Sequence, residues 1–299
     1  MSKKLEKVLV IGGGGFMGSH TADALSKKGY EVSIFDKKPS RWLRSDQEMI
    51  LGDYSEEIDL KNALKGVSLV YHFGAIADIA ESKRDPFNTL YFNILGTVKI
   101  LEAIKNTKVK RFLFASSMYV YSDLGSFYSV SKSSAESIIE AYGKEFGIDF
   151  TLMRYGSLYG SRSQDWNAIR DFVKQILKTK KLTYSGTGKE IREYINVEDA
   201  AELSVKLLDK KYANNAYTIT GQQTIKVDDL FSILFEIIGM KRKVDFLDDN
   251  SRSEHYGLTP YRHKAKDAKK IVPTEFKDLG QGLLEIVEEV QVELDKSES

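Results

Sequence analysis

The chain lacks cysteine entirely, and its 299 residues include only four histidines. Without cysteine there is no disulfide, no thiolate nucleophile and no cysteine-based metal site. The histidines, His20, His72, His255 and His263, show no ligand spacing, so we expect no metal site. An excess of charge of either sign is also absent, because the 44 Lys and Arg residues are nearly balanced by 43 Asp and Glu residues. A nucleic acid or a charged membrane surface is therefore not an expected partner.

Long apolar runs are missing as well. No segment approaches the roughly 20 consecutive apolar residues that a membrane-spanning helix needs, and residues 1–7 show no hydrophobic signal core. We therefore expect a cytoplasmic protein that does not insert into a membrane. A length of 299 residues allows one large domain or two modest ones.

A glycine-rich loop directly follows the first predicted strand. Residues 7–11 are apolar, which is typical of a buried parallel strand, and residues 12–18 read Gly-Gly-Gly-Gly-Phe-Met-Gly before a helix-like stretch that ends at Gly29. Glycines allow a sharp turn and a close approach of the backbone to a pyrophosphate, whose charge the N-terminus of the next helix stabilises. This context predicts a dinucleotide-binding site rather than a merely flexible turn.

A carboxylate at the end of the second predicted strand, 30–35, indicates which dinucleotide binds. Asp36 can accept hydrogen bonds from the ribose hydroxyls of NAD, and it would repel the additional phosphate of NADP. Four cations follow it: Lys37, Lys38, Arg41 and Arg44. They form either a solvated loop or a clamp for that phosphate. The sequence thus favours NAD without excluding NADP.

Strand-like and helix-like segments alternate along the chain, which indicates a parallel sheet with helices on both faces. Further strands are predicted at 48–53, 68–74, 110–116, 149–155 and 216–220, and helices at 59–65, 87–105, 131–146, 227–238 and 281–294. We predict an α/β fold with a Rossmann-type, doubly wound, six-stranded domain over residues 1–155. A smaller α/β domain over residues 156–299 would bind the substrate, and a segment near 196–220 would return to the first domain.

Tyr128 and Lys132 are the residues best suited to catalysis. A free tyrosine has a pKa near 10 and is a poor base at neutral pH. A lysine four residues later on a helix lies one turn away on the same face, where its charge can stabilise the phenolate. This spacing is common in helices that have no catalytic role. It is informative here because it follows the glycine loop and the pair Ser116-Ser117 at a strand end.

In this order the motifs resemble the extended short-chain dehydrogenases/reductases, and within them the NAD-dependent nucleotide-sugar epimerase/dehydratase family. The resemblance covers nearly the whole chain. Its motifs are Gly12-x-x-Gly15-x-x-Gly18, Asp36, Gly52-Asp53, His72-Phe73-Gly74-Ala75, Asn93 with Gly96-Thr97, Ser116-Ser117 with Val120-Tyr121, Tyr128 to Lys132, Arg154-Tyr155 with Tyr159-Gly160, Gly186-x-Gly188 with Arg192, and Val197-Glu198-Asp199.

The resemblance implies NAD as the cofactor and a nucleotide-diphosphate sugar as the substrate. Asp53 would contact the adenine, and Tyr155 would lie beside the nicotinamide. The implied cofactor-binding residues are Gly12, Gly15, Phe16, Met17, Gly18, Asp36, Asp53, Tyr54, Phe73, Gly74, Ala75, Asn93, Tyr128, Lys132 and Tyr155. The implied substrate-binding residues are Ser117, Ser157, Asn167 and Arg192. Two chains would pair as a homodimer through the helices predicted at 87–105 and 131–146.

The resemblance also implies the reaction. Alignment on Val120-Tyr121 places the catalytic hydroxyl on Ser117, although the serine pair could instead cap the strand end. Tyr128 would take a proton from a sugar hydroxyl as hydride leaves the same carbon, while Ser117 hydrogen-bonds the reacting oxygen and Lys132 holds the nicotinamide ribose. Return of the hydride to the other face of the 4-keto sugar would give the 4-epimer.

Arg192 is the expected anchor for the diphosphate, because a guanidinium can donate two parallel hydrogen bonds to it. The alternative for this residue is an ordinary surface ion pair with Glu190 or Glu193. Family members that dehydrate or decarboxylate the sugar usually carry an acid just after the catalytic hydroxyl, where this chain has Met118-Tyr119. The absence of that acid favours simple redox chemistry or epimerisation over elimination.

Two departures from the family pattern concern the substrate. Ser157 replaces the usual asparagine that contacts the substrate phosphates, and the segment 122–127, which normally covers the sugar, is short. The sequence therefore predicts a 4-epimerase of surface polysaccharide or glycan precursor synthesis. One alternative is an NAD(P)H-dependent reductase of a 4-keto sugar or another carbonyl compound. The other is a non-catalytic NAD-binding sensor or scaffold, which would not need Ser117, Tyr128 and Lys132.

Overall fold

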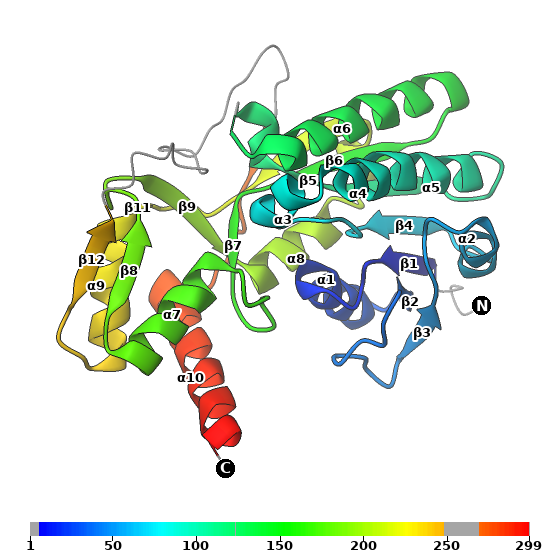
Figure 1. The fold of residues 1–299 in the computed structure, drawn as a ribbon. Helices are drawn as coiled ribbons and strands as arrows, with labels where there is room; N and C mark the ends of the chain where they lie inside the picture. The colour runs from blue at the N-terminus through cyan, green and yellow to red at the C-terminus, as the bar shows by residue number, and fades with distance from the viewer. Residues whose placement is uncertain (1–5, 123, 248–268, 299) are drawn as a thin grey trace.

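An eight-stranded sheet forms the centre of the computed structural model, which describes residues 6–122, 124–247 and 269–298 (Figure 1). The strand order is β13-β10-β6-β5-β4-β1-β2-β3, and every pair in it is parallel. The strands are β1 (Lys7–Ile11), β2 (Glu31–Asp36), β3 (Gln47–Leu51), β4 (Leu69–His72), β5 (Arg111–Ser117), β6 (Phe150–Tyr155), β10 (Asn215–Ile219) and β13 (Lys269–Ile271). The direction of winding reverses between β1 and β4, and such a point leaves a crevice at the carboxyl ends of the strands.

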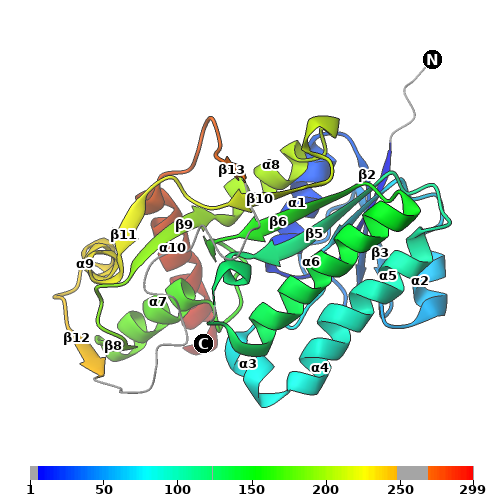
Figure 2. The same ribbon diagram turned by 90° about the horizontal axis from the view of Figure 1, so that it is seen from above.

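The two faces of this sheet are covered by different helices. Alternate residues of β1 point to opposite faces, so Val8 and Val10 belong to one apolar cluster while Leu9 and Ile11 belong to another. The first cluster includes buried residues of α1 (Phe16–Lys27) and α8 (Val197–Lys206), which pack on each other. The second includes residues of α2 (Glu57–Ala63), α5 (Gly96–Ile104) and α6 (Ser126–Phe146). Figure 2 shows α5 and α6 lying side by side on their face.

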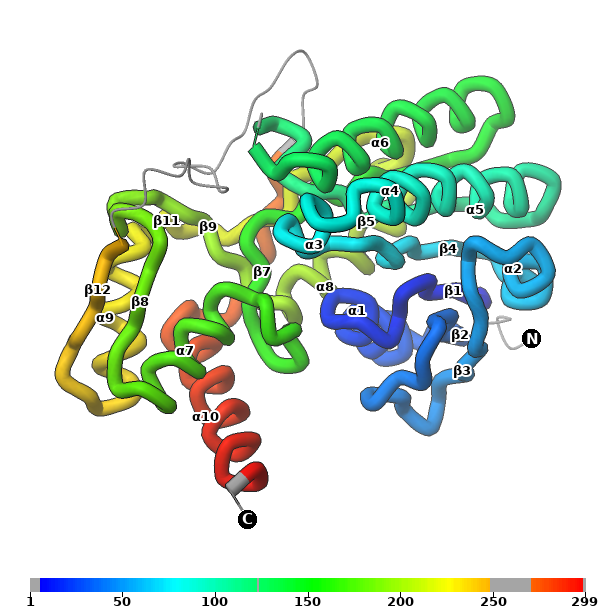
Figure 3. The backbone as a smooth tube through the Cα atoms, viewed as in Figure 1, coloured from blue at the N-terminus to red at the C-terminus, as the bar shows by residue number. Residues whose placement is uncertain are grey.

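The second half of the molecule has its own apolar core. It contains the small sheet β7 (Ser157–Tyr159), β9 (Ile191–Asn196) and β11 (Thr224–Lys226), the pair β8 (Leu182–Ser185) and β12 (Val244–Leu247), and the helices α7 (Ala168–Thr179), α9 (Val227–Ile238) and α10 (Leu279–Glu298). The apolar face of α7 is buried in this core. Figure 3 shows that the chain enters this second half after β6 and then returns to the first half, where α8 packs against α1.

The predicted α/β, doubly wound fold class is confirmed, but several details differ. The sheet has eight strands rather than six, because β10 and β13 extend it beyond β6. The helix predicted at 87–105 is divided into α4 (Pro86–Leu90), a π-helical turn (Tyr91–Leu95) and α5. Helix α6 starts five residues earlier than predicted, directly after Gly125, whose φ of 91° lets the chain turn into the helix.

Two further observations complete the fold. A short helix, α3 (Ile79–Arg84), follows β4 and was not predicted, because six residues are too few to establish a helical period. Within the ranges that the structure describes, none of the helices combines the length and the apolar composition needed to cross a membrane.

Candidate active site

A cavity of about 1390 Å³ opens at the carboxyl ends of the central strands. One wall comes from residues at the ends of β1, β2, β4, β5 and β6, and the other from α7, β8, β9 and the loops beside them. This is the crevice that the reversal of strand order creates, and it is the usual ligand site of open α/β sheets. The cavity is large enough for a dinucleotide and a second ligand together.

The glycine loop forms a cradle in this cavity that has no room for side chains. Gly12 has a φ of 75°, and a Cβ atom there would lie 2.5 Å from the backbone nitrogen of Gly74. A Cβ on Gly18 would lie 2.3 Å from the carbonyl oxygen of Gly12. Helix α1 starts at Phe16, so its first backbone N–H groups lie at the cavity wall, where they can bind a pyrophosphate. These features fit NAD.

Asp36 lies at the end of β2, in the same wall. Its Oδ2 accepts a hydrogen bond from the Gly14 backbone N–H at 3.0 Å, and its Oδ1 accepts one from Lys38 N at 3.3 Å. The Lys37 amine lies 2.9 Å from Asp53 and 4.0 Å from the centre of the Phe92 ring. Lys37 is thus held by a carboxylate and an aromatic ring, and the other three cations are exposed. This arrangement supports a solvated loop rather than a phosphate clamp.

We expect the protein to bind NAD more tightly than NADP. Asp36→Ala should reduce the difference between the two affinities. Loss of hydrogen bonds to a charged acceptor weakens binding by about 1.5–3 kcal/mol, or roughly 10- to 100-fold for NAD. Titration of the purified protein with both cofactors measures the ratio of the two affinities. Lys38→Ala is the control, because an exposed lysine of a solvated loop should leave this ratio unchanged. An NADP affinity equal to that for NAD in the unaltered protein would contradict the prediction.

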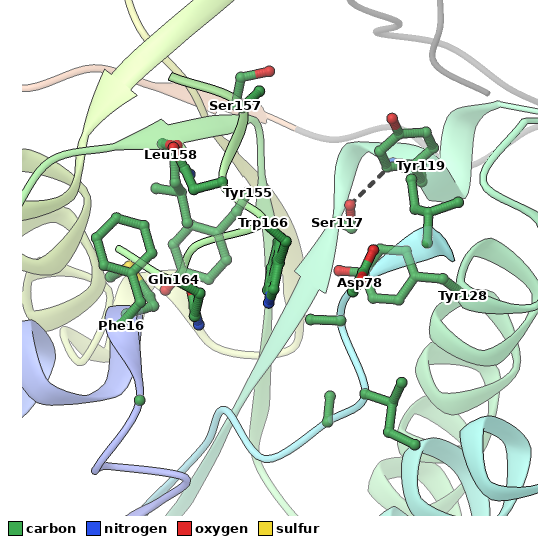
Figure 4. Close-up of a pocket in the computed structure, with 18 of the residues that line it drawn as sticks. Phe16, Asp78, Ser117, Tyr119, Tyr128, Tyr155, Ser157, Leu158, Gln164 and Trp166 are labelled. Atoms are coloured by element: carbon green, nitrogen blue, oxygen red, sulfur yellow. Dashed lines mark hydrogen bonds between the residues drawn. The ribbon is translucent and has the colours of Figure 1, made fainter. Parts of the chain in front are cut away.

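Ser117, Tyr128 and Lys132 all line this cavity, although they come from β5 and from the first two turns of α6. The Lys132 amine donates to the carbonyl oxygen of Ala115 at 2.7 Å and lies 5.9 Å from the centre of the Tyr128 ring. Ser117 Oγ accepts a hydrogen bond from Tyr119 N at 3.3 Å, so its own proton can be donated to a ligand. Figure 4 shows Ser117 and Tyr128 on one side of the pocket and Tyr155 on the other.

Burial dominates the electrostatics beside these residues. Burial lowers the pKa of Lys132 to about 7, and the charge of Glu136 opposes this shift. Burial also lowers the pKa of His72 to about 3, helped by the charge of Lys132, so His72 is neutral. Because the Lys132 pKa lies near neutrality, small changes around this amine decide whether it is charged.

Asn93 and Asp53, two of the cofactor-binding residues implied by the resemblance, are not among the residues that line the cavity. The Asn93 amide donates to Ile76 O at 2.9 Å and to Ser131 Oγ at 2.9 Å, and it accepts from Ile76 N at 2.8 Å. Asn93 therefore acts on the site by joining the loop after β4 to α6. The other implied residues line the cavity: Gly12, Gly15, Phe16, Met17, Gly18, Asp36, Tyr54, Phe73, Gly74, Ala75 and Tyr155.

The implied substrate residues other than Ser117 lie in the opposite wall. Ser157 begins β7, and the Asn167 side chain caps α7 through Arg170 N and donates to Leu158 O at 2.9 Å. Arg192 lines the cavity from β9 and is only 6% exposed, so it is not the surface residue of the alternative interpretation.

The surroundings of Arg192 show how its charge acts. Burial would raise the pKa of Glu190, but hydrogen bonds from Thr187 and the charge of Arg192 hold it below its usual value. The Arg192 Nη1 donates to Ile191 O at 3.2 Å. The guanidinium is thus a buried positive charge in the wall of the cavity, beside a carboxylate.

Several residues of the cavity were missed by the sequence analysis. They are Asp78, Gln164, Trp166 and Tyr184, which line the cavity together with Tyr119 and Glu190. Figure 4 shows Trp166 projecting between Tyr155 and Ser117, while Asp78 and Tyr119 lie near Tyr128. No motif marks the first four. Tyr119 could have been found, because it stands where related enzymes carry an acid.

No group of three or more potential ligands that could hold a metal ion occurs among the residues that the structure places. Two of the four histidines, His255 and His263, lie outside the described residues.

Comparison with known proteins decides the family. The family described as "NAD dependent epimerase/dehydratase family" matches residues 8–220. This chain belongs to that family. It is therefore an NAD-dependent enzyme, as the glycine cradle and Asp36 indicate.

Proteins with similar sequences are named for different activities. A putative UDP-glucose 4-epimerase from Methanocaldococcus jannaschii is 30% identical over 256 residues, which cover 78% of this chain and 83% of the relative. UDP-glucuronic acid decarboxylase 4 from Arabidopsis thaliana is 26% identical over 295 residues, which cover 89% of this chain and 65% of the relative.

A solved structure of the same family has a similar fold over nearly its full length. UDP-glucuronic acid 4-epimerase from Bacillus cereus, in complex with UDP-glucuronic acid and NAD, has a TM-score of 0.82 at 26% identity. The match covers 96% of this chain and 99% of that chain.

Proposed function

We propose that this protein is an NAD-dependent nucleotide-sugar 4-epimerase. The observation that carries the proposal is the meeting of Ser117, Tyr128 and Lys132 in one cavity with the glycine cradle. A second observation favours epimerisation over elimination. Two residues after Ser117 the chain has Tyr119 instead of an acid, and Tyr119 lines the same cavity. The centre of its ring lies 6.2 Å from the centre of the Tyr128 ring, in an edge-to-face arrangement.

The side chains divide the chemistry between them. Tyr128 removes the proton of the sugar 4-hydroxyl, and the charge of Lys132 stabilises the phenolate that does so. Ser117 donates its hydroxyl proton to the oxygen that becomes the 4-keto group. The glycine cradle and Asp36 would hold NAD, which would supply the acceptor and donor of hydride at the sugar carbon. Tyr128 then gives its proton back to the oxygen, so the enzyme ends the cycle unchanged.

Epimerisation requires the keto sugar to present its other face without leaving the site. Arg192 would hold the diphosphate by charge-assisted hydrogen bonds while the sugar turns. The volume of the cavity supports this step, because a cavity of about 1390 Å³ leaves room for rotation beside a bound dinucleotide. The nucleotide part of the substrate would remain in place throughout.

A direct test is to incubate the purified protein with UDP-, GDP-, CDP- and dTDP-sugars and to separate the products. We expect the 4-epimer of at least one sugar to form without net reduction of added NAD. Stoichiometric consumption of NADH or NADPH with a carbonyl substrate would identify a reductase instead. Binding of NAD without turnover of any nucleotide sugar or carbonyl compound would support the sensor or scaffold.

We also propose that the protein is a homodimer. Large apolar side chains are exposed on α4, the π-helical turn and α6, which pack beside one another: Phe87 (75%), Leu95 (50%) and Val130 (54%). Exposed apolar side chains on such a helical face are a feature of protein–protein contacts. A second copy of the same face would cover it with twofold symmetry.

Val130→Glu should convert the dimer to a monomer, because it places a charge on this apolar helical face. Light scattering coupled to size-exclusion chromatography measures the mass. Val292→Glu is the matched control, since Val292 is 51% exposed on α10, in the other half of the molecule (Figure 1). A monomeric mass of the unaltered protein would overturn the dimer.

A further inference from the structure

We propose that Glu136 is a positioning residue, which keeps Lys132 charged and, through its ion pair with Arg154, fixes the strands and the helix that carry the catalytic groups. This inference rests on the roles proposed above for Tyr128 and Lys132. Glu136 touches neither the cofactor site nor the sugar site. It lies behind the catalytic residues, fully buried between α6 and the sheet.

The ion pair between Glu136 and Arg154 is completely buried. Glu136 is 0% exposed and Arg154 is 1% exposed. The guanidinium donates twice, from Nε to Oε1 at 2.9 Å and from Nη2 to Oε2 at 2.6 Å. Ser116 Oγ donates to Oε1 at 2.5 Å, and Arg154 Nη1 donates to the Tyr121 hydroxyl at 2.5 Å. A planar guanidinium that meets a carboxylate with two bonds fixes direction as well as distance.

Three members of this network, Ser116, Arg154 and Glu136, lie next to residues of the active site. Ser116 precedes Ser117 in β5, and Arg154 precedes Tyr155 in β6. These two pairs are neighbours in the sheet, because Ser116 is in register with Arg154 and Ser117 with Tyr155. Glu136 lies one helical turn beyond Lys132 on α6. The network thus connects β5, β6 and α6 at the level of the reacting groups.

The surroundings of Lys132 make Glu136 electrically important. On α6 the amine has Tyr128 and Glu136 as titratable neighbours; on β5 it meets the Ala115 carbonyl and the Phe114 ring. On β4 it faces His72, which is neutral, and Arg154 on β6 is bound to Glu136; of these two charges it is that of Glu136 that shifts the pKa of Lys132. Burial lowers the pKa of Lys132 and Glu136 raises it. Without the Glu136 charge, the neutral amine would therefore form at lower pH.

Stability alone does not explain this pair. Transfer of two charges from water to the interior costs about as much as their attraction returns, so well-packed apolar residues often serve stability equally well. An apolar pair, however, would supply neither the negative charge beside Lys132 nor the directed bonds to Ser116 and Tyr121. Those are the features that the proposed chemistry needs.

Glu136→Gln tests the electrical part, because it keeps the shape and removes the charge. Turnover should show a bell-shaped dependence on pH, with Lys132 deprotonation as the alkaline limb. We expect this limb to move down by about one pH unit, which lowers turnover about tenfold at pH values above it, while the affinity for NAD is unchanged. Ser116→Ala is the control, since it removes one hydrogen bond and leaves the charge, so the limb should stay in place.

The double variant Glu136→Leu/Arg154→Met separates positioning from stability. We expect the double variant to melt at a higher temperature than Glu136→Leu. Its turnover should nevertheless stay low, and the alkaline limb of its pH profile should stay at lower pH than in the unaltered protein. Full recovery of turnover and of the pH profile in this variant would overturn the proposal. A fall of the thermal midpoint in Glu136→Gln with an unmoved alkaline limb would overturn it as well.

A measurement without substrate keeps this proposal distinct from the proposed function. Ultraviolet titration of the NAD complex records tyrosinate formation, and the difference between the unaltered protein and Tyr128→Phe isolates Tyr128. If no early-titrating tyrosinate disappears in Tyr128→Phe, the proposed role of Tyr128 fails. If it does disappear but Glu136→Gln titrates like the unaltered protein, the inference about Glu136 fails alone.

Discussion

Tyr128→Phe should lower turnover by about 100- to 10,000-fold and leave NAD binding nearly unchanged. The substitution removes one oxygen, which in our proposal acts in proton transfer to and from the sugar hydroxyl. The ring would still pack against Tyr119, so the wall of the cavity should keep its shape. Turnover of a confirmed substrate and titration with NAD measure the two effects separately.

Tyr119→Phe is the matched control for this prediction. Tyr119 is a second tyrosine of the same cavity and has no part in the proposed proton transfer, so loss of its hydroxyl should cost far less. The loss of turnover in Ser117→Ala should lie between those of the two tyrosine variants, at about 100- to 1,000-fold, because this change removes one donor to the developing oxyanion. Turnover of Tyr128→Phe within a few-fold of normal would show that the mechanism is wrong.

Arg192→Ala should raise the apparent Michaelis constant for a nucleotide sugar and leave cofactor affinity intact. Truncation of one partner in a buried charge-assisted pair costs about 2–5 kcal/mol, which corresponds to a factor of roughly 30 to several thousand. The lost contact lies far from the reacting carbon, so the turnover number at saturation should change much less.

Thermal shift gives an independent measurement of the Arg192 prediction. With NAD bound, a nucleotide sugar should raise the melting temperature, because a ligand selective for the native state stabilises it. Arg192→Ala should abolish this rise, and Arg192→Lys should restore only part of it, since lysine keeps the charge and loses the fork of donors. An unchanged response in Arg192→Ala would remove Arg192 from the substrate site.

The cofactor half of the site was largely predictable from sequence. The loop from Gly12 to Gly18 and the carboxylate of Asp36 are signals of local spacing, and local spacing fixes how strand, turn and helix meet. Ser117 and Tyr128 belong to separate motifs. The structure brings them together because α6 begins beside the carboxyl end of β5, the strand that carries Ser117.

The substrate half was not predictable in the same way. Arg192 has the composition of a surface residue, and a pair with Glu190 was a reasonable alternative until the structure showed Arg192 to be 6% exposed. Arg192 lies on β9, the central strand of the sheet β11-β9-β7, whose pairings join segments far apart in the chain. Trp166 lies in a loop without periodicity, so no local pattern indicated that it enters the cavity.

The sequence by itself determined the fold class and the cofactor loop, and it supplied the candidate catalytic side chains, because each depends on patterns that are local along the chain. Tertiary structure alone decided the extension of the sheet by β13, a strand of three residues that becomes visible only through its pairing with β10. It also decided the partnership of Glu136 with Arg154 and Ser116. That contact depends on the register between β5 and β6 and on the packing of α6 against them, and no spacing within one element encodes it.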